Sequence, residues 1–386
     1  MSDAAKPSVR ANPSRMIQLD FLRGIAILLV LFTHAIVQPD ESGRLRPVLN
    51  YLRYLGPTGV DLFFVLSGFL VGGLLFKELR ASAHLDVRRF LIRRAFRIWP
   101  SYFVFLGALF LGLIFFQHKT LADSVGVLWP NLLHVQNYFG TPRWHTWSLA
   151  VEEHFYLFLP LVLWLLTERP KNRLSMLPAI ASGVFILCAL LRFEAFTHPP
   201  AHYNPYTATH LRMDSLFFGV LLAYFYHLTP GRLKFVTRSR LKLFGAGAAL
   251  LLAFPALVIV AQSSLVVGSI GPVMLFSGYG CILLAVVYTP VGEGWLGRRW
   301  EGISARTVAF IGYFSYPIYL WHIDTNRPVS KLLDHLPLDH LTPEVRWLCA
   351  FAIYVLVAVA AGVLFGLVLE KPSLALRDRL FPSRTP

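Results

Sequence analysis

Apolar runs of about 17–22 residues recur along the whole chain, and each is long enough to cross a membrane as a helix. Only 15% of the residues are charged and 55% are hydrophobic, whereas a soluble domain carries about a quarter charged residues. The stretches between the runs leave no room for a separate soluble domain. The sequence therefore predicts an all-α integral membrane protein, with about ten transmembrane helices in one bundle.

The predicted spans divide the chain into three parts. We expect a disordered cytoplasmic tail over residues 1–16, a ten-span domain over 17–372 and a short basic cytoplasmic tail over 373–386. A short uncharged turn joins the seventh and eighth spans, so nine or eleven spans are alternatives. No internal repeat is visible, which weakens the case for a transporter built from inverted repeats. The approximate limits of the ten spans are 21–37, 59–76, 99–116, 148–166, 176–191, 211–228, 243–261, 269–288, 308–322 and 347–369.

The basic residues predict the orientation of the chain. With ten spans, the loops and tails on the side of the two termini hold 25 of the 36 Lys and Arg residues. Short loops rich in Lys and Arg stay in the cytoplasm, so we expect both termini there and a multi-pass protein of the bacterial cytoplasmic (inner) membrane. The net charge of +15 then indicates topology and contact with membrane lipids or an anionic cofactor, and no nucleic acid.

The cysteines predict neither a disulfide framework nor a metal site. Cys188, Cys281 and Cys349 are far apart and lie within or beside apolar runs, and no pair has ligand spacing. The first apolar run carries no small-residue cleavage signal, so we interpret it as a retained helix.

Two ionisable side chains lie in the first span, LDFLRGIAILLVLFTHA. Arg23 and His34 are eleven residues apart, which places them on one face of a helix and about 16 Å apart along its axis. Both have ordinary structural explanations, since Arg23 can anchor a helix end and His34 can bond to a neighbouring helix. Ionisable residues within a membrane are nevertheless candidate functional residues.

A second group of candidates lies in WHTWSLAVEEHFYLFLP, at the outer start of the fourth span. Glu152 and Glu153 can be explained as acidic residues near the positive end of a helix. Glu152 is expected about 8 Å below the outer surface, close to the height of His34, and His322 at the end of SYPIYLWH is expected at a similar level. A shared layer of His34, Glu152 and His322 would suit a general base and the groups that orient it.

A basic cluster, RRFLIRRAFRIWPSY, precedes the third span. It fits a positive-inside signal, but Arg94 and Arg97 are one helical turn apart and face the side where Arg23 emerges. Such a group can hold the phosphates of a nucleotide-bearing cofactor. In HLRMDSLFFG, by contrast, Arg212 and Asp214 predict a simple ion pair. The other candidate site residues are Glu153, His322, Ser67, Tyr156, Trp147 and Asp214.

At these residues the chain resembles the membrane acyltransferase-3 family, which includes bacterial O-acyltransferases of surface carbohydrates and related acceptors. The R-x10-H pair is Arg23 and His34. The segments DLFFVLSGFL, RRAFRIWPSY, WSLAVEEHFY, RMDSLFFG and SYPIYLWH follow in the family's order, and LEKP resembles its closing motif. Each motif is weak alone, but their order over most of the chain is specific.

The resemblance implies a ten-span body that takes an acyl group from cytoplasmic acyl-CoA, with acetyl-CoA the expected donor, and delivers it to a hydroxyl of a carbohydrate or lipid-linked glycan. Arg23 and His34 match the family's essential pair, Arg94 and Arg97 its RxxR motif, and Glu152 the glutamate of its WSLxxE segment. We expect His34 to act as general base, Glu152 to orient or charge it, and the arginines to hold the phosphates, with no metal. The sequence shows no outer SGNH domain, so we expect the stand-alone form.

Three questions remain open at the level of sequence. The acyl chain and the acceptor, whether surface polysaccharide, glucan, peptidoglycan or macrolide, are not specified, and an acyl-histidine intermediate is an alternative to direct attack. The oligomeric state is unknown. The rival function is a multi-pass transporter or flippase that uses the buried histidine and glutamate layer as a polar pathway.

Overall fold

The computed structural model describes residues 16–35, 44, 46–168, 173–292, 294–338 and 340–382. The predicted N-terminal tail therefore lies outside the described residues, apart from Met16. Within the described part of the chain the regular secondary structure is helical, without a strand, which confirms the predicted all-α membrane bundle.

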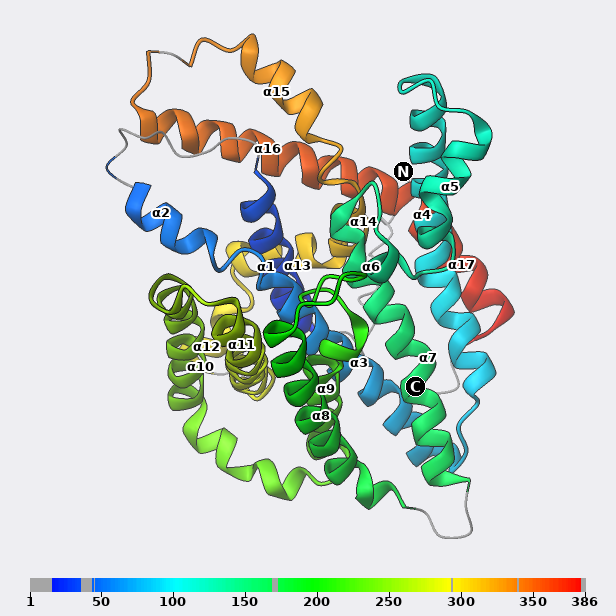
Figure 1. The fold of residues 1–386 in the computed structure, drawn as a ribbon. Coiled ribbons are helices and arrows are strands. Elements are labelled where there is room, and N and C mark those ends of the chain that lie inside the picture. Colours follow the sequence, from blue (N-terminus) through cyan, green and yellow to red (C-terminus); the bar gives the residue numbers. More distant parts are fainter. Residues whose placement is uncertain are drawn as a thin grey trace, which may run out of the picture.

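The helices follow the predicted spans closely, with short helices between them. Figure 1 shows α10, α11 and α12 on one flank and α4, α5 and α17 on the other, with α1 and α3 between them. The α-helices are α1 (Ile17–His34), α2 (Arg46–Arg53), α3 (Gly59–Ser82), α4 (Val87–Phe115), α5 (Leu121–Leu132), α6 (Gln136–Phe139), α7 (Trp147–Thr167), α8 (Leu177–Thr197), α9 (Met213–His227), α10 (Lys234–Ala261), α11 (Ser264–Val287), α12 (Gly294–Arg299), α13 (Ile303–Tyr313), α14 (Ser315–Trp321), α15 (Asn326–Asp334), α16 (Pro343–Phe365) and α17 (Lys371–Leu380).

All ten predicted spans are helical, and the described residues contain eight helices long and apolar enough to cross a membrane. The two that fall short are the sixth and the ninth. The sixth is α9, with only 15 residues. The ninth is divided into α13 and α14 at Phe314, whose φ of −96° and ψ of 15° are not helical. This break matters because α14 leads directly to His322.

Glycines allow the central helices to approach closely. A Cβ atom at Gly68 of α3 would collide with the carbonyl oxygen of Leu216 in α9, and a Cβ at Gly219 would collide with that of Val65. The helices α1 and α13 meet in the same way, through Gly24 and Gly312. Small residues at such crossings are typical of membrane helices. The second crossing fixes α1 beside α13, and with it the position of the neighbouring Arg23.

Two buried ion pairs connect α3, α8 and α9. Arg212 lies 2.5 Å from Asp61, and Arg192 lies 2.6 Å from Asp214, with both side chains of the second pair only 1% exposed. The predicted Arg212–Asp214 pair is therefore wrong. The two residues are only two apart, so their side chains leave α9 in different directions, and each finds its partner on another helix.

The segment before α7 returns into the bundle instead of crossing the outer surface. Asn131, Gln136, His145 and Thr146 are all at most 2% exposed. Two of their side-chain amides donate within the segment: Gln136 Nε2 donates to the Thr146 carbonyl oxygen at 2.8 Å, and Asn131 Nδ2 donates to Thr146 Oγ1 at 3.1 Å. A 3₁₀ turn (Trp144–Thr146) then leads into α7, so that this helix begins inside the protein.

The last described helix, α17, packs on the basic start of α4. A π-helical turn over Gly366–Glu370 follows α16 and leads into α17, so the predicted basic tail includes a helix. Ser373 Oγ donates to the Phe96 carbonyl oxygen at 2.5 Å, and Arg93 Nη2 lies 3.2 Å from the Asp378 carboxylate. These contacts hold α4 where its next arginines, Arg94 and Arg97, turn inward.

Candidate active site

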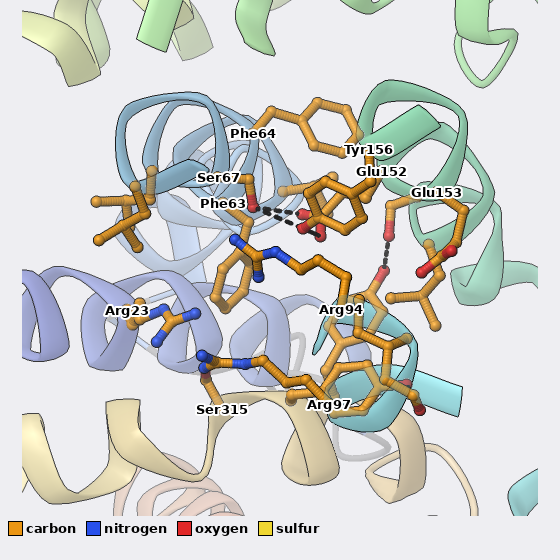
Figure 2. A pocket seen from close by; sticks show the side chains of 18 residues that line it. Arg23, Phe63, Phe64, Ser67, Arg94, Arg97, Glu152, Glu153, Tyr156 and Ser315 are labelled. Atoms are coloured by element: carbon orange, nitrogen blue, oxygen red, sulfur yellow. Dashed lines mark hydrogen bonds between the residues drawn. The ribbon is translucent and has the colours of Figure 1, made fainter. Parts of the chain in front are cut away.

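Three arginines from two helices meet in a pocket within the bundle. Arg23 from α1 and Arg94 and Arg97 from α4 line it together, and Figure 2 shows their guanidinium groups gathered on one side of the pocket. The pocket lies between α1, α3, α4, α7 and α14. Among the described residues, none of the three guanidinium groups lies within ion-pair distance of a carboxylate. A half-buried cluster of unpaired cations is suited to bind an anion.

The opposite wall of this arginine pocket holds the acidic segment of α7. Ser67 Oγ donates to Glu152 Oε1 at 3.0 Å, and Tyr156 Oη donates to Glu152 Oε2 at 2.6 Å (Figure 2). Glu153 accepts a hydrogen bond from Trp99 Nε1 at 3.3 Å. The Arg94 guanidinium lies over the Tyr156 ring, 4.8 Å from its centroid. Both carboxylates and Ser67 thus belong to the arginine pocket.

His34 lies in a different place, within a cluster of three histidines. His322 Nε2 is 3.4 Å from His34 Nδ1, and the ring centroids of His322 and His145 are 5.0 Å apart. His322 is fully buried and His145 is 1% exposed, whereas His34 is partly exposed. Among the described residues, the cluster joins α1, the turn before α7 and the residue that follows α14.

The ring nitrogens of His34 have defined roles. Its Nδ1 lies 3.0 Å from the Val30 carbonyl oxygen, which can only accept, so Nδ1 carries the proton and the lone pair of the neutral ring is on Nε2. In the same way, His322 Nδ1 donates to the Tyr319 carbonyl oxygen at 2.7 Å, which leaves His322 Nε2 as an acceptor facing His34. The cluster therefore presents His34 with an unprotonated Nε2.

The expected layer of His34, Glu152 and His322 is only half correct. The structure brings the two histidines together, but both Glu152 oxygens are occupied by Ser67 and Tyr156, and no hydrogen bond joins Glu152 to His34 in the described residues. The reason is the buried start of α7. His145 takes the level predicted for Glu152, which comes seven residues later and thus about 10 Å farther along the helix.

Tyr319 connects the two sites. Its side chain lines the arginine pocket, and its hydroxyl lies 2.7 Å from Ser148 Oγ and donates to the His145 carbonyl oxygen at 2.6 Å. Its own carbonyl oxygen holds the ring of His322. Tyr319 thus contacts both the arginine pocket and the histidine cluster, so the two sites are neighbours.

Two sequence candidates lie outside both sites. Asp214 forms a buried ion pair with Arg192 and lines neither site. Trp147 packs its ring 5.8 Å from that of Phe64, which lines the arginine pocket, and lies under the Arg212 guanidinium at 5.7 Å. Trp147 therefore packs beside the wall of the arginine pocket through Phe64.

Comparison with known proteins agrees with this arrangement. Residues 16–367, which include the arginine pocket and the histidine cluster, match the family described as an acyltransferase domain (Acyl_transf_3). The chain belongs to this acyltransferase family. The resemblance of the ordered motifs is thereby confirmed, as is the assignment to a family of acyltransferase enzymes. No solved structure matches the chain significantly.

Curated relatives of this chain share the same region. A Staphylococcus aureus (strain COL) protein named "Putative O-acetyltransferase" is 30% identical over 79% of this chain and 49% of its own length. The "Peptidoglycan O-acetyltransferase OatA" of Listeria monocytogenes is 27% identical over 85% of this chain and 52% of its own. The "Putative peptidoglycan O-acetyltransferase YrhL" of Bacillus subtilis is 28% identical over 81% and 49%. The chain spans about half the length of these relatives.

Sequence reasoning missed His145 as a member of the acyltransferase's histidine cluster. It precedes the predicted fourth span and was assigned to an outer loop. One signal was available: His145 lies inside the same motif as Glu152, between two tryptophans in WHTWS. Apolar residues on both sides of a histidine are consistent with burial, although the partner helix could not be read from them.

Proposed function

We propose that this multi-pass membrane protein is an O-acyltransferase that moves an acyl group, with acetyl the expected one, from cytoplasmic acyl-CoA to a hydroxyl of a glycan acceptor. The observation that carries the proposal is the group of three unpaired guanidinium groups beside the histidine cluster, in a chain of the acyltransferase family. The O-acetyltransferase names of the relatives support an acetyl donor and a glycan such as peptidoglycan as acceptor.

The arginine pocket fits the phosphates of the donor. Arg23, Arg94 and Arg97 offer planar, permanently charged groups that suit phosphate oxygens, and their side chains are already gathered. Arg23 and His34 share α1, about 16 Å apart along its axis. An extended pantetheine arm is of comparable length, so phosphates at the arginines would allow the thioester to approach the histidine cluster past Tyr319.

His34 is suited to be the general base. Its Nε2 would take the proton from the acceptor hydroxyl while the hydroxyl oxygen attacks the thioester carbonyl carbon. The C–O bond forms, the C–S bond breaks, and the proton held on Nε2 passes to the leaving thiolate. As His34 becomes positively charged, its Nδ1–H remains bonded to the Val30 carbonyl and faces His322 Nε2. General-base catalysis of this kind contributes about 10²–10⁴-fold.

The donor site is tested by binding of acetyl-CoA to purified protein in lipid nanodiscs. Arg94→Ala and Arg97→Ala should each raise the Kd by about 10- to 150-fold, because one charge-assisted contact is worth about 1.5–3 kcal/mol. Arg88→Ala is the matched control, since Arg88 lies on the same helix, is exposed and does not line the pocket. Normal acetyl-CoA binding by both pocket variants would show that the arginines do not bind the donor and act only in setting the membrane topology.

The chemistry is tested in the same preparation with His34→Ala. This variant should bind acetyl-CoA normally and lose transfer and acetyl-CoA hydrolysis. If wild-type protein shows no acetyl-CoA turnover at all, the enzyme assignment fails and a transport function would gain support.

We further propose that both termini face the cytoplasm and that the loop 117–147, which contains Lys119, faces outward in the inner membrane. The test is Lys119→Cys in a protein whose three native cysteines are replaced by serine. A membrane-impermeant maleimide should label it in intact spheroplasts. Labelling only after lysis would reverse the orientation.

A further inference from the structure

A second cavity lies at the end of the bundle that carries the histidine cluster. It has a volume of about 780 Å³ and opens at the place where α8 ends and α11 begins, and it is walled by the segments 136–147 and 195–207. We call it the aromatic cavity, because seven of its lining residues are aromatic: Tyr138, Phe139, Trp144, Trp147, Phe196, Tyr203 and Tyr206.

The aromatic cavity contrasts chemically with the arginine pocket. Among the described residues no Asp, Glu, Lys or Arg lines it, and its remaining polar groups are amides, hydroxyls and the imidazole of His202. Phe139 is 64% exposed, Trp144 57% and Tyr206 42%, so these rings are available to a ligand. Such a lining suits a molecule that is uncharged and amphipathic. A sugar ring has these properties, with C–H groups on its faces and hydroxyls at its edge.

The walls of the aromatic cavity are held in place before a ligand arrives. Asn137 Nδ2 donates to Thr209 Oγ1 at 2.8 Å and to the Thr207 carbonyl oxygen at 3.3 Å, and Thr207 Oγ1 donates back to the Asn137 carbonyl oxygen at 3.2 Å. Tyr138 of the first segment is also bonded at 2.9 Å to His210, which lies just after the second segment. A pre-formed site avoids the entropy cost of ordering loops on binding.

One turn of the chain connects this cavity to the histidine cluster. Trp144 and His145 are consecutive residues of the 3₁₀ turn. Trp144 lines the aromatic cavity, while His145 is buried with its ring 5.0 Å from that of His322, which in turn reaches His34. A molecule held on Trp144 is therefore next to the wall of the cluster that contains the proposed base.

We propose that the aromatic cavity binds the acceptor as an uncharged sugar segment, with one ring stacked on Trp144. This inference rests on the proposed O-acyltransferase function and adds the place and the charge class of the acceptor. The donor phosphates and the acceptor sugar are then recognised by different chemistry at different ends of the bundle, cations for one and aromatic faces for the other.

The test uses protein in nanodiscs and two soluble probes: chitotetraose, an uncharged tetrasaccharide, and a hyaluronan tetrasaccharide, which carries carboxylates. Calorimetry should show that wild-type protein binds chitotetraose more tightly. Trp144→Ala should weaken that binding about fivefold or more, and Trp144→Phe should retain most of it, because an aromatic face remains. The matched control is Phe116→Ala, since Phe116 is 82% exposed and does not line the cavity.

The outcomes separate this inference from the proposed function. Acetyl-CoA turnover by the wild type tests the function, whereas the sugar-binding series tests the cavity. With turnover intact, failure of the wild type to bind chitotetraose would overturn the inference. So would tighter binding of the charged tetrasaccharide, or equal binding by Trp144→Ala and wild type.

Discussion

His322 Nε2 lies 3.4 Å from His34 Nδ1, although the two residues are 288 positions apart in the chain. The contact exists because α14 ends just before His322 and because α1, held against α13, ends at His34. His322, and not Glu152, is therefore the side chain that contacts the His34 ring.

His322→Ala should lower kcat for acetyl transfer by about tenfold or more, as a part of the 10²–10⁴ that general-base catalysis supplies. His322→Gln should restore some activity, because its amide oxygen can still accept from His34 Nδ1. The measurement is kcat as a function of pH, since loss of the orienting contact should alter the profile's shape. His198→Ala, at an exposed histidine, is the control. An unaltered profile in His322→Ala would leave the contact with only a packing role.

Glu152→Gln should affect donor binding, because Glu152 lies in the arginine pocket. The amide oxygen can still accept from Ser67, while one negative charge near the bound phosphates is removed. The Kd for acetyl-CoA should fall severalfold, because one negative charge that repels the bound phosphates is removed from the same pocket. A changed pH profile of transfer with an unchanged Kd would instead indicate that Glu152 acts on His34.

Asp214→Asn should destabilise the fold without acting on the chemistry. It leaves the Arg192 charge buried and unpaired, at a cost of about 3–5 kcal/mol. Thermal unfolding in detergent should show a large fall in Tm, which the double variant Arg192→Met, Asp214→Leu largely reverses. Glu194→Gln is the control, since its pair with His198 is exposed and contributes little. A normal Tm for Asp214→Asn would contradict the structural role.

The segment between α5 and α6 should become less stable in acid. Burial, with a smaller effect of His154, lowers the pKa of His134 from 6.5 to about 4. The unfolded segment then binds the proton more readily than the folded one, so the stabilising contribution is present above pH 6.5 and is lost as the pH falls towards 4. Hydrogen exchange of this segment should accelerate between pH 6.5 and 5 after correction for intrinsic rates. His134→Gln should remove that dependence, and its persistence would locate the titrating group elsewhere.

The sequence by itself determined the membrane bundle and the residues worth considering. A backbone in lipid must satisfy its hydrogen bonds internally, and an apolar run of spanning length does so as a helix. The positions of the membrane helices therefore follow from the positions of the apolar runs. The spacing of Arg23 and His34 also fixes their common face, since it depends only on helical periodicity.

The tertiary structure decided which candidates meet. The sequence predicts the depth of a residue from the point where its helix should cross the membrane surface. This prediction was wrong for α7, because the buried amides of the preceding segment hold the start of the helix inside the bundle. As a result, His145 lies in the histidine cluster and Glu152 lies in the arginine pocket. Helix partners depend on close crossings such as Gly68 with Gly219 and on ion pairs such as Arg192 with Asp214. These contacts join residues far apart in sequence, and no local periodicity specifies them.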